Sequence, residues 1–123
     1  MSKREPLHEW TDPITGEVHK CPIKYVSKIR EAMVPRVGAV HAILANALLL
    51  SIGEPTTDAS QRHLRQAVQI LRGEGLAIVS KRSSRGGYFV AATFKELEDF
   101  CAIQEKLARS MLAGIDHMRA AYR

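Results

Sequence analysis

Residues 61–72 divide into an apolar half and a polar half when they are placed on a helical wheel at about 100° per residue. The segment 56–60 (TTDAS) is rich in residues that cap helix N-termini, and Gly73 and Gly75 provide a stop. We therefore expect a helix over Ser60–Arg72 with one side in a hydrophobic core. The apolar side holds Leu64, Ala67, Val68, Ile70 and Leu71, the polar side holds Gln61, Arg62, Arg65, Gln66, Gln69 and Arg72, and His63 lies at the border.

The polar side of this expected helix carries only arginine and glutamine. A solvated helix face ordinarily mixes glutamate and lysine, which pair favourably four residues apart. Arginine can form paired hydrogen bonds with O6 and N7 of guanine, and glutamine with N6 and N7 of adenine. The face is therefore typical of a helix that reads base edges in DNA, and the alternative is an ordinary exposed face of biased composition.

The net charge of the chain is concentrated in one short segment. The 18 lysines and arginines exceed the 13 aspartates and glutamates by five. Residues 60–87 hold six of the basic residues and one acid, Glu74, whereas the other residues are balanced at twelve of each sign. Such a localised basic patch indicates a protein that binds a polyanion, although charge alone fits a solvated surface equally well.

A polar, glycine-ended connection separates two short apolar segments, Leu76–Ser80 and Tyr88–Ala91. Their β-branched and aromatic residues predict a β-hairpin with a basic tip. A tip of this kind can place cations on a phosphate backbone or in a minor groove. The candidate DNA contacts in it are Lys81, Arg82, Ser83, Ser84 and Arg85.

The N-terminal third predicts an arm followed by a helix. Residues 1–22 are expected to form an N-terminal arm with a turn at Asp12–Gly16, which indicates a marginal hairpin. Residues 23–33 then show one helical face, and Pro35 should end or restart that helix. The apolar residues at helical spacing are Tyr25, Val26, Ile29 and Met33.

Residues 36–52 are nearly all apolar and rich in alanine and leucine. This composition predicts a central core helix or a buried interface, which Gly53 and Pro55 end. Residues 23–92 are then expected to form one domain. The fold class that we predict is α+β and mostly α.

Residues 93–123 predict one long helix. Thr93 and Glu96 match a capping box, and apolar residues recur in alternating steps of four and three. We expect this helix to form a homodimer, although it can also fold back on its own core. The expected seam is Leu97, Cys101, Gln104, Ala108, Met111, Ile115, Met118 and Tyr122, in which Gln104 and Ala108 are weak core residues.

The sequence offers no pattern for catalysis or metal binding. His8, His19 and Cys21 lack the spacing of a metal site, and nucleotide loops, nucleophile motifs and paired carboxylates are missing. We therefore expect no enzyme, no cofactor and no metal. Cys21 and Cys101 are too few to form a disulfide framework and are expected to be reduced thiols.

The expected location is the cytoplasm. No apolar run approaches the roughly 20 residues that cross a bilayer, so we expect no contact with a membrane. Residues 1–7 are too polar for a signal peptide.

The segment Leu71–Ser80 (LRGEGLAIVS), followed by Gly86–Val90 (GGYFV), resembles winged helix-turn-helix domains of the biotin-repressor type. It also resembles small phage and prophage helix-turn-helix proteins. The resemblance covers Gln61–Ala91 well and implies a DNA-binding domain with a two-stranded wing. Matched residue by residue, it places Arg62, Arg65 and Gln66 on the recognition helix and Arg82 and Arg85 in the wing.

One feature departs from that family, which has a full helix between the core helix and the recognition helix. Only residues 52–59 are available for it here. Either that helix is abbreviated, or residues 36–50 contain a break.

These observations predict a sequence-specific binder of double-stranded DNA, a phage or bacterial transcriptional regulator that works as a dimer on a palindromic site. The alternative is a winged-helix adaptor, such as a phage replication accessory or an inhibitor of a host factor. Its partner would be a host or phage protein that covers the apolar segment 37–50 or meets the basic face.

Overall fold

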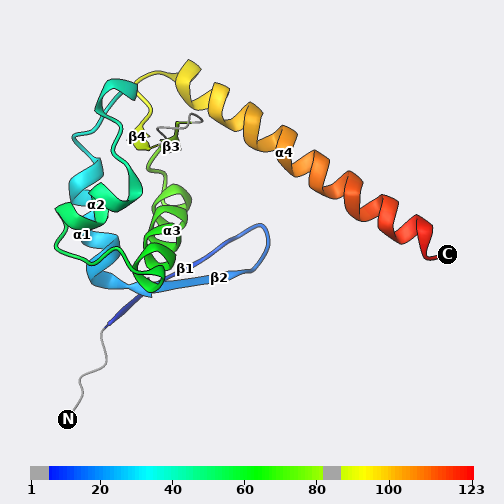
Figure 1. Ribbon diagram of the computed structural model, residues 1–123, viewed down its shortest axis with the longest axis horizontal. Helices are drawn as coiled ribbons and strands as arrows, with labels where there is room; N and C mark the ends of the chain where they lie inside the picture. The colour runs from blue at the N-terminus through cyan, green and yellow to red at the C-terminus, as the bar shows by residue number, and fades with distance from the viewer. Residues whose placement is uncertain (1–5, 82–86) are drawn as a thin grey trace, which may run out of the picture. The chain divides into compact units, whose positions relative to one another are not determined.

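The computed structural model describes residues 6–81 and 87–123 and divides the chain into two compact units. The first unit ends at Ala92, and the second comprises Thr93–Arg123. The described residues are α+β and mostly helical, with four α-helices and two separate two-stranded sheets (Figure 1). The elements are β1 (Leu7–Thr11), β2 (Val18–Pro22), α1 (Ile23–Met33), the 3₁₀-helix η1 (Ala39–His41), α2 (Ala45–Ser51), α3 (Asp58–Gly73), β3 (Ile78–Ser80), β4 (Tyr88–Val90) and α4 (Phe94–Ala121).

Helix α1 has the bounds and the buried face that the sequence predicts. Its four apolar residues at helical spacing are buried, and the helix packs against α2 and α3. These three helices and Ile78 of β3 share one hydrophobic core. Burial of α1 therefore follows directly from its sequence pattern.

Helix α3 begins two residues before the predicted start and ends one residue after the predicted end. The side-chain oxygen of Thr57 accepts a hydrogen bond from the backbone N–H of Ser60 at 3.2 Å and so caps the helix. Gly75 follows the helix with φ of +102°, a conformation that favours glycine. The residues predicted for the apolar side are all buried: Leu64, Ala67, Val68, Ile70 and Leu71.

Strands β3 and β4 pair antiparallel where the sequence predicts a hairpin. Val79 lies opposite Phe89, and the backbone N–H of Lys81 donates to the carbonyl of Gly87 at 2.8 Å. This hydrogen bond joins the two ends of the connection between the strands. The candidate contact residues Arg82, Ser83, Ser84 and Arg85 lie outside the described residues.

The prediction of a single core helix over residues 36–52 is wrong. The segment contains the short helix η1 and then α2 of seven residues. Two isolated bridges join it to β4, one on each side of η1: Val37 pairs with Val90, and Ile43 pairs with Tyr88. Residues 36–50 therefore contain a break, and the helix before α3 is α2.

The backbone of β4 explains this break. The N–H groups of Tyr88 and Val90 donate to the carbonyls of Ile43 and Arg36 at 2.8 Å, so the second edge of this short strand is hydrogen-bonded. A helix over 36–44 would leave these strand groups without these partners. Gly38 has φ of +93°, which permits the turn, and Val40 is 90% exposed, which a core helix would not allow.

Strands β1 and β2 form an antiparallel hairpin around the predicted turn at Asp12–Gly16. The backbone N–H of Asp12 donates to the carbonyl of Glu17, and that of Gly16 to the carbonyl of Asp12, both at 2.8 Å. The N–H of Ile14 donates to Oδ1 of Asp12 at 2.8 Å and lowers the pKa of that carboxyl. The turn is thus fixed by an Asx-type contact.

The β1–β2 hairpin packs on α1 and α3, so the segment expected to be an arm belongs to the first unit. Cys21 is fully buried, and its thiol donates to the carbonyl of His63 at 3.4 Å. The indole of Trp10 lies against the backbone of Gly73, which has no side chain to keep it away. The apolar side chains of this segment are what hold it on the helices.

Helix α4 forms the second unit with the predicted bounds. The side-chain oxygen of Thr93 accepts a hydrogen bond from the backbone N–H of Glu96 at 3.2 Å. None of its 28 residues, all of which the structure describes, is buried. Within the described ranges, no helix combines the length and the apolar character needed to cross a membrane.

Substitution of Gly73 by alanine should destabilise the first unit. The new Cβ would come within 2.6 Å of three ring carbons of Trp10, so the indole would have to move. We expect a loss of about 1–3 kcal/mol in the free energy of unfolding, measured by urea denaturation with circular dichroism. The fluorescence of Trp10, the only tryptophan, should shift in the folded variant.

The matched control is Gly114→Ala in α4, which lies in the second unit and where a Cβ meets nothing within 4 Å in its own chain. There the better helix propensity of alanine acts on α4, so the unfolding of the first unit, followed by the fluorescence of Trp10, should be unchanged. Equal stability of Gly73→Ala and the native protein would contradict the packing of Trp10 on Gly73.

Burial raises the pKa of the Cys21 thiol to about 11. Because the thiolate is the reactive form, Cys21 should not react in the folded protein. In a Cys101→Ser variant, which retains Cys21 as its one thiol, maleimide at about pH 8 should add no mass under native conditions and one label in denaturant. Rapid labelling of the folded variant would show that the hairpin opens readily.

Candidate nucleic-acid interface

The polar side of α3 has an exposed centre. The predicted polar residues form an arc around the helix, which we call the polar arc: in order, Gln61, Arg72, Arg65, Gln69, Arg62 and Gln66. Arg65, Gln69 and Arg62 occupy its middle, and all three are exposed. Neither arginine forms a hydrogen bond or ion pair with any other residue in the described ranges. Two exposed guanidinium groups therefore lie near each other on the surface of the helix, without an ion pair in the described part of the chain.

Two of the predicted contact residues have partners inside the protein. Nε of Arg72 donates to the backbone carbonyl of Ile78 at 2.7 Å and links α3 to β3. Nε2 of Gln61 donates to Oδ1 of Asn46 at 2.9 Å and links α3 to α2. Both lie at one edge of the polar arc, where they hold neighbouring elements against the helix.

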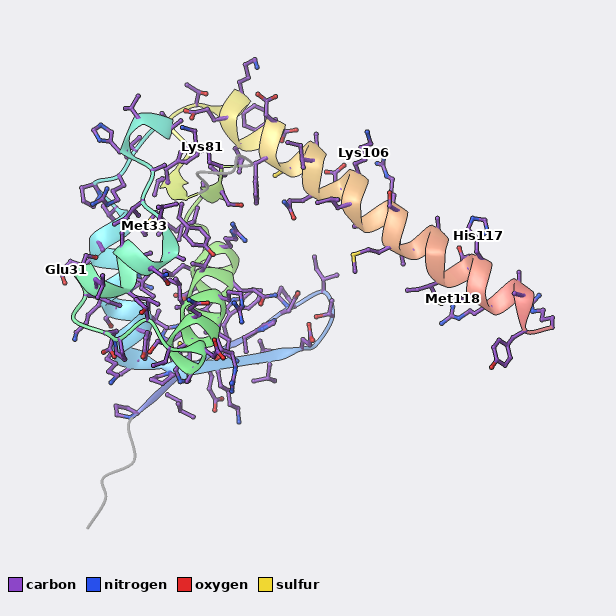
Figure 2. The ribbon with its side chains drawn as sticks, viewed as in Figure 1. Glu31, Met33, Lys81, Lys106, His117 and Met118 are labelled. Atoms are coloured by element: carbon purple, nitrogen blue, oxygen red, sulfur yellow. The ribbon has the colours of Figure 1, made fainter. Side chains whose placement is uncertain are left out.

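A hollow of about 290 Å³ continues the polar arc toward the β3–β4 hairpin. Two arginines, a serine and a tyrosine give it a polar and basic lining, so the helix face and the strands form one continuous surface. The lining residues are Arg65, Val68, Gln69, Arg72, Ser80 and Tyr88. Lys81, which is exposed, follows directly after β3 (Figure 2).

The β1–β2 hairpin borders the opposite edge of the arc. Trp10 covers Gly73 there, and Gln66 is half-buried. Of the predicted base-reading residues, the structure thus brings Arg62, Arg65 and Gln69 together at the exposed centre and leaves Gln66 at the border. The strip between the two hairpins is the part of α3 that a ligand can reach.

Acidic groups lie at both ends of this strip. Glu74 accepts from Nε2 of His8 at 2.7 Å and from Arg30 at 3.3 Å, so two basic groups surround its carboxylate. Asp58 is on the polar arc at the start of α3, because the helix begins earlier than predicted. An acid in the first turn is favourable for the helix dipole but places one negative charge on the face.

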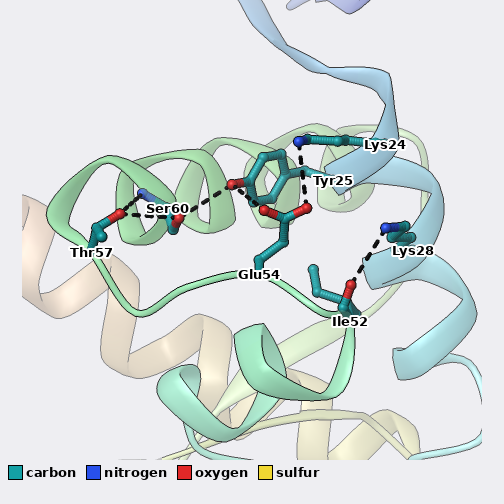
Figure 3. A network of polar contacts seen from close by, with 7 residues as sticks. All are labelled: Lys24, Tyr25, Lys28, Ile52, Glu54, Thr57 and Ser60. Carbon is teal, nitrogen blue, oxygen red and sulfur yellow. Dashed lines mark hydrogen bonds and ion pairs between the residues drawn. The ribbon is translucent and has the colours of Figure 1, made fainter.

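A network of polar contacts fixes the N-terminus of α3 to α1 (Figure 3). Thr57 Oγ1 donates to Ser60 Oγ at 3.1 Å, which lies 3.2 Å from the hydroxyl of Tyr25, and that hydroxyl donates to Glu54 at 3.1 Å. Nζ of Lys24 lies 3.5 Å from the other oxygen of Glu54. Each hydroxyl can therefore donate once along a chain that ends on a carboxylate.

This network is a feature that the sequence interpretation missed. Its members are 29 and 35 positions apart, so no local pattern reveals it. The available signal is chemical: a tyrosine on the buried face of α1 needs a partner for its hydroxyl, and a glutamate in the adjoining loop can accept from it.

The histidines and cysteine of the N-terminal segment point to separate partners. His8 contacts Glu74, the ring of His19 stacks on Trp10 with centroids 5.7 Å apart, and Cys21 lies under α3. No group of three potential metal ligands occurs in the part of the chain that the structure describes.

No family model, no curated protein and no solved structure matches this chain.

Removal of the Tyr25 hydroxyl tests the network. In Tyr25→Phe, Glu54 and Ser60 each lose a contact, and we expect the free energy of unfolding to fall by about 1 kcal/mol. Urea denaturation measures this loss, and Tyr122→Phe is the control because Tyr122 is 95% exposed. An unchanged midpoint for Tyr25→Phe would show that the hydroxyl chain contributes nothing to stability.

Proposed function

We propose that the first unit contains, in residues 23–92, a winged helix-turn-helix that binds double-stranded DNA in a sequence-specific way, with the β1–β2 hairpin packed on its helices. The observation that carries this proposal is the polar arc of α3, where Arg62 and Arg65 are exposed without a partner among the described residues. Uncompensated guanidinium groups beside an exposed glutamine suit the donor and acceptor pattern of base edges in the major groove.

The order of the elements supports the proposal. A core helix, α1, is followed by the short helix α2, the amphipathic helix α3 and the β3–β4 hairpin. The resemblance to winged-helix domains implies this order, with α2 as an abbreviated first helix of the helix-turn-helix. Its seven residues make about two turns.

The proposed contacts divide into two groups. Arg62, Arg65 and Gln69 of α3 read base edges, with the half-buried Gln66 at the border of this group. Lys81 holds a phosphate, and so do Arg82 and Arg85, two residues that lie outside the described part of the chain. Gln61 and Arg72 position the helix through their contacts with Asn46 and Ile78. The proposal contains no catalytic step and needs no cofactor.

A second candidate function is that of an adaptor that binds another protein. Its support is the apolar surface that residues 37–50 leave exposed. Val40 is 90%, Leu50 66% and Leu44 52% exposed, which is unusual for side chains of this kind clustered in one short segment. We prefer the DNA-binding function because the basic charge lies on α3 and the adjoining hairpin and not on this segment.

Selection of bound sequences from random duplex DNA tests the proposal first. The protein should enrich one motif, and binding should weaken steeply as salt increases. On that motif Arg65→Ala should lose about 1–3 kcal/mol of binding free energy and accept other bases at one position. Arg109→Ala in α4, which removes the same charge elsewhere, is the control and should bind normally. An equal loss on all sequences would exclude base reading by Arg65.

Lys81→Ala should weaken binding to every sequence alike. The slope of the logarithm of affinity against the logarithm of salt concentration should become shallower by about 1, since one phosphate contact is lost. Lys106→Ala, on an exposed side of α4, should leave the slope unchanged. No binding of the native protein at low salt, together with stoichiometric capture of one protein from nuclease-treated lysate, would favour the adaptor.

A further inference from the structure

Helix α4 has an apolar stripe that its own chain leaves exposed. Met111 is 70%, Met118 64% and Tyr122 95% exposed, and all three lie on the seam that the sequence predicts. Lys106 and His117 lie on a different side of the helix from Met118 (Figure 2). Helices in proteins owe most of their stability to packing of an apolar face, so the exposed stripe favours a partner that covers it.

The charges of α4 are separated along its length. Residues 94–108 contain two lysines and four carboxylates, whereas residues 109–123 contain three arginines and one aspartate. We propose that α4 pairs with α4 of a second copy of this chain in antiparallel orientation. The acidic half of each helix then lies beside the basic half of the other, and the helix dipoles oppose each other favourably.

The antiparallel arrangement matches a large side chain with a small one in two of its four different seam pairs, while Leu97 faces Tyr122 and Gln104 faces Ile115 in the other two. We consider the register in which each seam residue of one copy lies opposite a seam residue of the other. In this register Met111 faces Ala108 of the second copy, and Met118 faces Cys101. Leu107, beside the seam, lies next to Gly114, which has open space around it. Alternation of large and small residues is what fills a helix interface without voids.

The same register brings opposite charges together at the edge of the seam. Glu98 directly follows Leu97, and Arg119 directly follows Met118. Glu98 of each copy then lies next to Arg119 of the other, which gives two symmetric ion pairs. Both side chains are exposed and form no ion pair with any other residue of the described chain.

A parallel pair lacks these matches. In a parallel pair each seam residue would face the same residue of the other chain. Ala108 would then face Ala108 and leave a void, and Gln104 would face Gln104. The edge contacts would join Phe100 to Glu105 and Gly114 to Arg119, without an opposite charge in either. Antiparallel pairing is therefore the arrangement that the side chains of α4 favour.

Disulfide cross-linking of the full chain distinguishes the two orientations. In the antiparallel pair the two Cys101 residues are about 26 Å apart along the axis, far beyond disulfide reach, whereas position 118 faces Cys101. Oxidised Met118→Cys should give covalent dimers, and the native protein and the control Lys106→Cys should give none. Cys21 is fully buried and cannot contribute in the folded protein. Covalent dimers of the native protein through Cys101 would instead indicate parallel pairing and overturn the proposal.

A charge exchange provides a second test that does not depend on cysteine. Glu98→Arg and Arg119→Glu should each raise the dissociation constant of the dimer roughly three- to tenfold, and the double variant should restore it. Sedimentation equilibrium measures this constant, and circular dichroism checks that each variant keeps its helix.

A native protein that stays monomeric at high concentration would overturn the proposal, with α4 then covered by its own core or by another protein. So would a double variant as weak as the single ones. Neither measurement uses DNA, so failure here is distinct from failure of the proposed function.

Discussion

Burial of the apolar side of α3 is the interaction on which the first unit depends. Helices α1 and α2, both strands of the N-terminal hairpin and β3 all contact this one helix. Its five predicted apolar residues are at most 2% exposed, which makes α3 the scaffold and not an appendage. Removal of any neighbour would expose part of the same surface, so these elements are expected to fold cooperatively.

This arrangement also determines which part of α3 can serve another molecule. The apolar side is covered, Gln61 and Arg72 tie the helix to α2 and β3, and Trp10 covers its C-terminal end at Gly73. The arginines and glutamine that remain project from a helix that is held on several sides. Side chains on such a rigid element reach a ligand with little loss of backbone entropy, which would favour the proposed recognition of bases.

The sequence pattern was sufficient to predict those elements whose structure follows from local apolar periodicity. The buried faces of α1 and α3 and the bounds of α4 follow from apolar spacing and capping residues. The prediction of a helix over residues 36–44 was wrong because their composition favours a helix. In the structure these residues instead supply the hydrogen-bond partners for the edge of β4 that does not face β3. The polar residues of α3 could be predicted directly from the sequence. The partners of Gln61 and Arg72 and the packing of Trp10 could not be predicted, because they depend on residues in other elements of the fold.

The contact of Trp10 with Gly73 links two positions 63 residues apart in the sequence. A side chain at position 73 fits beside the present position of the ring only when position 10 carries a smaller group, so an indole at position 10 favours glycine at 73. In a set of related sequences the two positions should therefore vary together: glycine would accompany tryptophan, and a larger residue at 73 would accompany the loss of the ring. Such paired variation would identify other proteins in which the same hairpin is docked on the same helix.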